Sequence, residues 1–465
     1  MVGRILQPEI KSLIEARDFA ALRELFEDWP PADVAEVILD MEENDQVIIF
    51  RVLPHVLAAD VFEYLGIEAQ QQLLRGMAHE QVVGILNEMS PDDRTALLEE
   101  LPSAAARQLI QLLTPEERRV AQALLGYPEG SVGRLMTPDF IAVHADWTIK
   151  EVLEYVREHG QDSETLNVIY VVDERGKLLD DLRIREILLQ PLHSKVSELM
   201  NENFVSLRVA EPEQDAVHVF RKYDRTVLPV TDSNAVLVGM VTIDDMLDVA
   251  EEEATEDIHK FGGMEALEEP YMRIPLMTMV GKRAPWLVVL LIGEMLTATA
   301  MAFYEHEIAK AVVLAVFLPM IISSGGNSGS QASTLIIRAM ALGEVTLRDW
   351  WRVMKRELMA GALLGVFLGV IGAARVAIWS VVLEKYRGEK IYGEYWPQVA
   401  ATIGITLTCV VLWGSLSGSM LPFALRRFGL DPATSSAPFV ATLVDVTGVI
   451  IYFSIALFIM RGTLL

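Results

Sequence analysis

APFVATLVDVTGVIIYFSIALFIM, residues 437–460, is an apolar stretch with a single charged side chain, that of Asp445. A run of this length is sufficient to cross the hydrocarbon core of a bilayer as a helix. A charge at that depth costs at least ~2.5 kcal/mol, so an intramembrane carboxylate generally has a partner. Because Thr442 and Thr447 are its polar neighbours in the stretch, the expected partner of Asp445 is a cation.

A polar run, SSGGNSGSQ at residues 323–331, lies inside another apolar stretch, and we expect it to break that span in mid-course. Polar, glycine-rich backbone at membrane depth occurs only where it is buried in protein or lines a watery cavity. The two stretches together predict an ion path. Glu294 is a second intramembrane carboxylate. It is interpreted as a further ion site, as a proton-linked group, as a partner of Arg375, or as a residue near the membrane interface.

Five apolar segments follow residue 283, at about 286–304, 311–341, 356–383, 397–424 and 438–461. With the N-terminus inside, nine basic residues lie at cytoplasmic ends and five on the opposite side, in agreement with the positive-inside rule. The sequence therefore predicts a polytopic α-helical membrane domain of five spans, residues 281–465. Four glycines of the third span, spaced for close helix approach, predict packing within the chain or a dimer seam: Gly361, Gly365, Gly369 and Gly372.

Charge divides the chain into two halves. Residues 1–280 hold 54 acidic and 24 basic side chains, whereas residues 281–465 hold 11 and 15. An acidic soluble half would be repelled by phosphates, which argues against nucleic acid as a partner. Because residues 1–40 contain no apolar core flanked by basic residues, we expect no cleavable signal peptide and a cytoplasmic soluble half.

The soluble half divides into two patterns. Residues 1–130 carry apolar side chains at steps of three and four, with Pro-led helix starts at Pro91 and Pro115, and so predict an all-α superhelical N-domain. Residues 131–247 contain a repeat. LMTPDFI at 135–141 recurs as LMNENFV at 199–205, and each copy continues with a helix and an apolar strand. This repeat resembles a tandem pair of CBS domains, of α/β type, over 131–195 and 196–247.

CBS pairs often bind adenosine nucleotides, and the resemblance implies such a ligand here. The first copy has Leu179-Asp180-Asp181-Leu182 where a small residue is usual, which argues against nucleotide binding in that copy. Residues 248–280 are expected to form a connecting helix between the repeat and the first span. Eight of the fourteen residues from Asp244 to Asp257 are acidic, and such a helix is costly unless cations neutralise it. The alternative is a solvated linker helix.

The order of these parts resembles that of the MgtE family of magnesium channels and transporters over essentially the whole chain. Three motifs carry the resemblance: EATEDIHK at 253–260, GGNSG-x-Q at 325–331 and ATLVDVTG at 441–448. The resemblance implies a homodimer in the bacterial inner membrane, with a pore on the dimer axis in which Asp445 holds hydrated Mg²⁺. It also implies that cytosolic Mg²⁺ bridges acidic faces of the soluble half and closes the pore.

The resemblance assigns two groups of residues, taken position by position. The remaining magnesium-binding acids are expected at Asp60, Asp92, Asp224, Asp245, Asp248, Glu253, Glu256, Asp257 and Asp431. The pore is expected to be lined by Gly325, Gly326, Asn327, Gly329, Gln331, Ala441 and Thr442.

Two other functions remain open from the sequence. One is a proton-coupled carrier for another divalent metal such as Mn, Co or Zn, with Glu294 carrying the proton. The other is a membrane-tethered nucleotide sensor. An enzyme is not expected, because the sequence contains no Walker-type loop, zinc-binding His pair or nucleophile–base set. Selectivity between Mg²⁺ and other divalent cations is not determined by the sequence.

Overall fold

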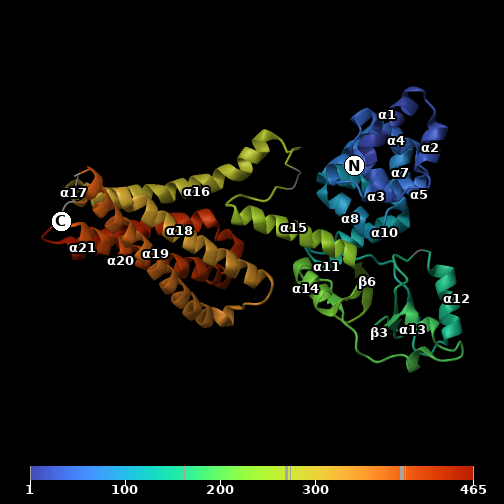
Figure 1. The fold of residues 1–465 in the computed structure, drawn as a ribbon. Coiled ribbons are helices and arrows are strands. Elements are labelled where there is room, and N and C mark those ends of the chain that lie inside the picture. The colour runs from blue at the N-terminus through green and yellow to red at the C-terminus, as the bar shows by residue number, and fades with distance from the viewer. Residues whose placement is uncertain are drawn as a thin grey trace. The chain divides into compact units, whose positions relative to one another are not determined.

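A computed structural model describes residues 2–161, 163–267, 271–272, 274–387, 392 and 394–463. The chain forms two compact units, Met1–Glu251 and Glu252–Leu465 (Figure 1). Helix α15, Ile243–Phe261, contains the boundary between the units. Residues 268–270 and 273 of the expected connecting segment lie outside the described residues.

Ten short helices begin the first unit. They are α1 (Val2–Glu15), α2 (Phe19–Phe26), α3 (Pro31–Leu39), α4 (Glu43–Val52), α5 (His55–Glu63), α6 (Ile67–Gly76), α7 (His79–Glu88), α8 (Pro91–Glu100), α9 (Ser103–Leu112) and α10 (Pro115–Leu124). Both predicted Pro-led starts are confirmed, at α8 and α10. At α10 the Thr114 hydroxyl accepts the Glu117 N–H (3.3 Å), which satisfies one free donor of the first turn.

Alternate helices of this region pack in a row, α3 on α5, α5 on α7 and α7 on α9, as expected of stacked helices. Helix α8 packs instead against α10 and against α11 (Val132–Leu135). Its Arg94 is fully buried. The Arg94 guanidinium donates to the Leu86 carbonyl oxygen (3.1 Å) and forms an ion pair with Glu117. Buried charge of this kind is tolerated because it is paired.

The repeat is confirmed as two sheets of the same design. The elements are β1 (Ala142–His144), α12 (Ile149–His159), β2 (Val168–Val172), β3 (Leu178–Arg183), α13 (Ile184–Leu188), β4 (Leu207–Arg208), α14 (Glu213–Tyr223), β5 (Val227–Thr231) and β6 (Leu237–Thr242). The strand orders are β1-β2-β3 and β4-β5-β6, with the first pair parallel and the second antiparallel in each. Tyr170 of β2 and Met240 of β6 share one buried core, which joins the two copies.

The acidic pair that distinguishes the first copy is structural. Asp180 of β3 is completely buried, and its carboxylate accepts the backbone N–H groups of Asn201 (2.7 Å) and Glu202 (3.0 Å), where the second copy begins. Asp181 pairs with Arg225 of the second copy at 3.0 Å. Burial raises the pKa of Asp181 to about 6, although the Arg225 charge opposes this rise. The pair therefore ties the two copies together.

Among its described residues, the second unit contains six α-helices after α15. They are α16 (Leu276–Phe303), α17 (Glu305–Lys310), α18 (Val312–Ala341), α19 (Trp350–Arg387), α20 (Trp396–Arg427) and α21 (Ala437–Met460). Five of them, all but α17, are long and apolar enough to cross a membrane, as the sequence predicts. The expected break in the second span is wrong, because α18 is one continuous helix through residues 323–331. The helical hydrogen bonds satisfy this backbone internally.

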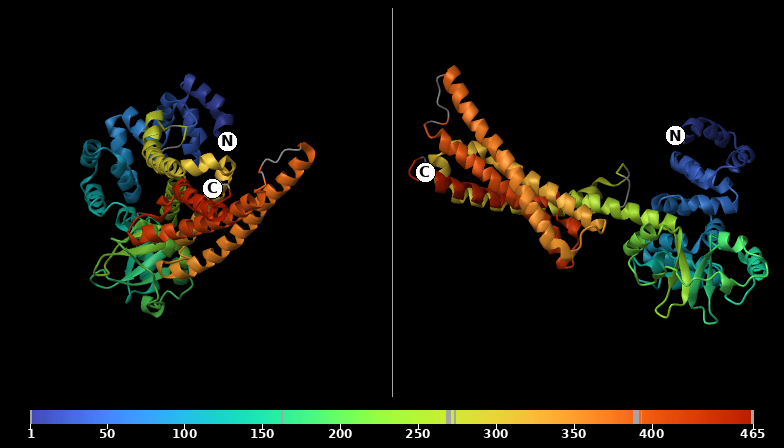
Figure 2. Two further views of the ribbon diagram at one scale, coloured as in Figure 1. Left: turned by 90° about the vertical axis from the view of Figure 1, so that its left-hand side faces the viewer. Right: turned by 60° about the horizontal axis from the view of Figure 1, so that its bottom comes forward.

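The glycines of the third span pack within the chain. Helices α19 and α20 lie side by side (Figure 2). A Cβ placed on Gly365 would lie 2.6 Å from the Thr408 carbonyl oxygen of α20, a distance that only glycine permits. On the other side of α20, a Cβ on Gly329 of α18 would lie 3.0 Å from the Gly414 carbonyl oxygen. Helices α18, α19 and α20 therefore form one close-packed block.

Candidate functional site

Each unit contains a candidate site with acidic side chains, and the two sites are described separately. In the membrane unit, α18 and α21 enclose a cavity of about 340 Å³. The residues that line it are Pro319, Ile322, Ser323, Gly326, Asn327, Ser330, Ala441 and Asp445. We refer to it as the membrane cavity. The Asp445 carboxylate, from the motif at 441–448, and the Asn327 amide, from the motif at 325–331, both line this cavity.

Helical spacing explains this lining. Ser323 and Asn327 lie four residues apart on α18, and Ala441 and Asp445 lie four apart on α21, so each pair shares one face. A Cβ on Gly326 would lie 3.5 Å from Ala441, which shows how closely the two helices approach. The Asn327 side chain is exposed in the single chain, although it lies at mid-span.

The other predicted pore residues have different surroundings. Gly325 and Gly329 are buried against α20 and α21, and Gln331 is exposed away from the membrane cavity. The Thr442 hydroxyl donates to the Pro438 carbonyl oxygen (3.0 Å), and its methyl group faces Gly293 of α16. Of the seven predicted pore residues, only Gly326, Asn327 and Ala441 line the membrane cavity.

Glu294 of α16 is a neighbour of Asp445 in the structure, although the two residues lie far apart in the sequence. The two carboxyl groups lie close enough to interact, where α16 packs against α21. Arg375, the alternative partner of Glu294, lies instead over the ring of Trp379, with 4.7 Å between the guanidinium carbon and the ring centroid. Asp445 is therefore held between the membrane cavity and a second carboxyl group.

In the soluble unit, eight carboxyl groups from four segments come together. They are Asp60 and Glu63 of α5, Asp92 and Asp93 of α8, Glu164 of the loop before β2, and Asp244, Asp245 and Asp248 of α15. We refer to them as the acidic cluster. Burial is the first cause of a raised pKa at seven of them, and the charges of neighbouring members raise the pKa further at six.

Two members of the acidic cluster have pKa values near neutrality. Burial raises the pKa of Glu63 to about 7, although the Ser90 backbone N–H donates to its carboxylate (2.9 Å). Burial raises the pKa of Asp245 to about 7 as well, although the Thr242 hydroxyl donates to it (2.8 Å). The carboxylates of the cluster therefore repel one another when they are ionised, and a positive charge among them would stabilise their ionised forms.

Asp92 is the member of the acidic cluster best suited to interact with a cation. It is 9% exposed, and burial together with the Asp245 charge raises its pKa well above the usual range. Its Oδ1 is buried and has no hydrogen-bond partner among the described residues. Within that part of the chain, no three Asp, Glu, His or Cys side chains converge closely enough to ligate one ion directly. A hydrated Mg²⁺ fits this arrangement, because it keeps several waters and binds through one or two carboxylates.

The sequence identifies four members of the acidic cluster: Asp60, Asp92, Asp245 and Asp248. It misses Glu63, Asp93, Glu164 and Asp244. Asp93 and Asp244 adjoin predicted members, and Glu63 lies one turn after Asp60, so helical spacing could have found these three. Glu164 has no such signal. Asp224 has a different position, because it ends α14 in the left-handed conformation (φ 49°) and is not among the charges that act on the cluster.

The remaining predicted acids belong to the second unit. Glu253, Glu256 and Asp257 lie on the last turns of α15, and Asp431 lies in the loop before α21. Lys260 joins two of them, with its Nζ 2.5 Å from Glu256 Oε1 and 2.7 Å from Asp431 Oδ2. Burial and the charge of Asp431 raise the pKa of Asp257. A lysine therefore already neutralises part of this group.

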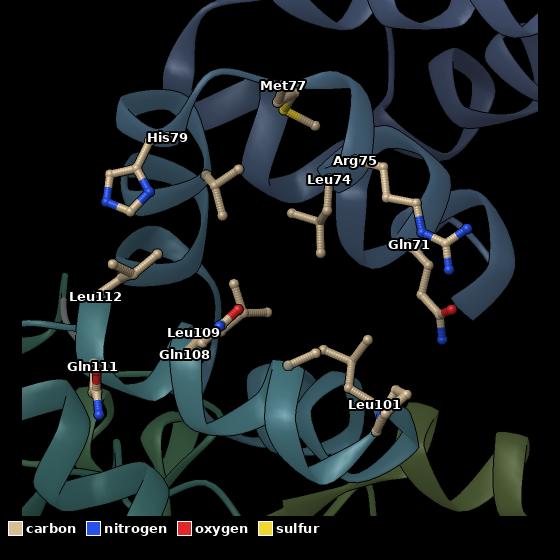
Figure 3. A pocket seen from close by; sticks show the side chains of 13 residues that line it. Gln71, Leu74, Arg75, Met77, His79, Leu101, Gln108, Leu109, Gln111 and Leu112 are labelled. Atoms are coloured by element: carbon tan, nitrogen blue, oxygen red, sulfur yellow. The ribbon is translucent and has the colours of Figure 1, made fainter.

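A further hollow lies away from both groups. It has a volume of about 590 Å³ and lies between α6, α7 and α9 (Figure 3). Leu74, Leu101 and Leu109 extend into it, and Arg75 and His79 lie at its rim. None of the residues that line it is acidic, so it is not a candidate cation site.

Comparison with known proteins covers all parts of the chain. The model of the divalent cation transporter family MgtE matches residues 318–455, that of the MgtE intracellular N domain matches residues 29–130, and that of the CBS domain matches 132–190 and 196–252. The magnesium transporter MgtE of Thermus thermophilus is 36% identical over 97% of this chain and 98% of its own length. That of Bacillus subtilis is 28% identical over 95% and 93%.

A solved structure agrees with these matches. The crystal structure of the cytosolic domain of the Mg²⁺ channel MgtE in complex with ATP is 34% identical, with a TM-score of 0.50. It covers 52% of this chain and 98% of that domain. These relatives are transporters and channels rather than enzymes. The chain therefore belongs to the MgtE family of magnesium transporters.

Proposed function

We propose that the chain is a magnesium channel of the bacterial inner membrane, with Asp445 as the ion-binding residue of its pore. The observation that carries the proposal is the shared position of Asp445 and Asn327 on the membrane cavity. A carboxylate and an amide at the depth of two membrane helices require a polar environment. A hydrated cation supplies that environment.

A second copy of the chain completes the proposed pore. Asn327 is exposed and Asp445 is half-buried in the single chain, so both would otherwise contact lipid tails. That contact is costly for polar side chains. With a two-fold axis beside the membrane cavity, two Asp445 carboxylates would face one hydrated ion. A divalent cation gains ~2.3 kcal/mol per charge from 100 mV of membrane potential, which is sufficient to drive entry.

The acidic cluster is the proposed magnesium sensor. Cytosolic Mg²⁺ would bind at Asp92 and neutralise the surrounding carboxylates, so that the N-domain, the CBS pair and the first turns of α15 stay together. When Mg²⁺ is low, mutual repulsion would separate them and release the connecting helix. The unpartnered Asp92 oxygen and the raised pKa values support this proposal.

The CBS pair is a proposed nucleotide site. A relative's cytosolic domain has been crystallised with ATP, which supports an adenosine nucleotide as a ligand here. In the first copy, Asp180 and Asp181 are occupied by structural contacts, so the second copy is the better candidate. The alternative function, a proton-coupled carrier for another divalent metal, is not favoured, because the relatives are named magnesium transporters.

Reconstituted protein tests the proposal. We expect a Mg²⁺ gradient alone to drive Mg²⁺ into liposomes that contain the chain, and Mg²⁺ on the cytosolic side to reduce that flux. Planar bilayers should show unitary currents carried by Mg²⁺. A flux that requires a pH gradient and shows no unitary events would refute the channel and restore the coupled carrier.

Replacing Lys260 by glutamine should weaken the end of α15 in the absence of Mg²⁺. The change removes two partly exposed ion pairs, worth about 1 kcal/mol together, and leaves the Glu256, Asp257 and Asp431 charges unbalanced. We expect amide hydrogen exchange at residues 256–263 to be about fivefold faster without Mg²⁺, and Mg²⁺ to restore most of the protection. Lys260→Arg is the matched control and should behave as wild type. Unchanged exchange in Lys260→Gln would mean that these pairs do not hold the helix.

A further inference from the structure

A second cavity of the membrane unit lies at one end of α19 and α20. It has a volume of about 880 Å³, within the range of about 300–1,000 Å³ that is usual for ligand sites. The residues that line it are Leu347, Trp350, Met354, Met420, Phe423, Ala424, Arg427 and Phe428. We refer to it as the interfacial cavity. It shares no residue with the membrane cavity.

The interfacial cavity is apolar except at one end. Leucine, methionine and phenylalanine side chains form most of its wall, and Arg427 is the one charged residue among those that line it. No ion pair or hydrogen bond of the Arg427 guanidinium occurs within the part of the chain that the structure describes. A permanently charged guanidinium beside an apolar cavity matches a ligand that has an anionic head and an apolar tail.

The position of the interfacial cavity at the cytoplasmic face of the membrane indicates which class of ligand it fits. With the soluble half in the cytoplasm, α19 begins and α20 ends at the inner face of the membrane. Trp350 and Trp351 are each 49% exposed there, as expected at the level of lipid headgroups. Further exposed basic side chains surround that end of the two helices: Arg348, Arg352, Lys355, Arg356 and Arg426. Basic pockets between membrane helices on the cytoplasmic side are suited to anionic lipid headgroups.

We propose that the interfacial cavity binds one anionic phospholipid of the inner leaflet. The phosphate forms charge-assisted hydrogen bonds with Arg427, and an acyl chain lies along Met354, Met420 and Phe423. Arg427 gives the site its preference for an anionic headgroup, whereas the apolar wall retains the chain. The site does not depend on which ion the protein carries.

Native mass spectrometry of the full chain in neutral detergent, titrated with phosphatidylglycerol or phosphatidylcholine, tests the proposal. We expect one phosphatidylglycerol per chain to bind at least fivefold more tightly than phosphatidylcholine, and Arg427→Gln to remove that preference. Arg426→Gln is the matched control, because it removes the same charge from the adjacent position, and Arg426 does not line the cavity. It should retain the preference.

A second variant tests the apolar wall. Ala424→Trp should fill the cavity and reduce bound lipid of both kinds, while cross-linking of the two copies stays unchanged. Equal losses in Arg427→Gln and Arg426→Gln would overturn the proposal in favour of diffuse attraction to the basic surface. Loss of cross-linked dimer in Ala424→Trp, with lipid binding unchanged, would overturn it in favour of a second copy as the occupant.

Discussion

Asp445→Asn should reduce Mg²⁺ flux by at least tenfold. The substitution keeps the size of the side chain and removes the one carboxylate that lines the membrane cavity. A hydrated divalent ion that loses a nearby carboxylate at membrane depth loses well over ~1.4 kcal/mol, which corresponds to a factor of ten. The measurement is the initial rate of Mg²⁺ entry into liposomes at a fixed gradient, for equal amounts of reconstituted protein.

Thr442→Val is the matched control for that experiment. The sequence assigns Thr442 to the pore, but the structure directs it to Pro438 and Gly293. We therefore expect its flux to stay within twofold of wild type. Full flux in Asp445→Asn would contradict the proposed ion site and would favour a role of the spans as an anchor. A loss in Thr442→Val as large as that in Asp445→Asn would mean that α21 is oriented differently in the assembled pore.

The stability of the soluble unit should fall as the pH rises, and Mg²⁺ should reverse the fall. Glu63 and Asp245 have folded pKa values of about 7, above the usual values near 4.5 and 3.8. At pH values between the usual pKa and the folded pKa, the folded state binds more protons than the unfolded state. The free energy of unfolding therefore decreases as the pH rises through this range, and it levels off above about pH 7. We expect a loss of roughly 2 kcal/mol between pH 5 and pH 8, after a discount for partial exposure.

Thermal unfolding of the full chain, with and without Mg²⁺ at both pH values, measures this effect. Mg²⁺ should raise the midpoint more at pH 8 than at pH 5, because more carboxylates are charged there. Asp92→Asn should raise the Mg²⁺-free midpoint at pH 8 and reduce the effect of Mg²⁺. Asp224→Asn removes the same charge outside the acidic cluster and should change neither quantity. A midpoint that does not depend on pH in the wild type would show that the cluster is solvated.

The sequence predicts the elements of this fold well where a local pattern specifies them. The Pro-led starts of α8 and α10 and the apolar runs of the spans have local causes, so the sequence predicts them directly. The polar run 323–331 misleads because composition alone does not distinguish a broken helix from an intact one with a glycine-rich face. The close approach of α20, visible only in three dimensions, decides between them.

The candidate sites also contain some residues that the sequence predicts and others that only the fold reveals. Asp445 lies in one of the motifs that carry the family resemblance, and the resemblance also predicts Asp92 as a sensor residue. The resemblance does not identify Glu164 or Glu294, whose neighbours come from distant segments. It also assigns Asp224 to the sensor, and that residue ends α14 in the left-handed conformation, outside the acidic cluster. Long-range proximity between like charges leaves no periodic signal, so only the fold reveals which carboxylates repel one another.

The uneven packing of the membrane helices has a mechanical consequence. In the most apolar 18-residue stretch of α20, 56% of the residues are buried within the chain, whereas in that of α16 only 6% are. The glycine contacts make α18, α19 and α20 a stiff frame, whereas α16 rests on α21 along one narrow side. A force on α16 would therefore meet little resistance from the frame and would be delivered to α21, at the turn that carries Asp445. Asp445 therefore lies where the loosely packed first span meets the closely packed helices of the membrane unit.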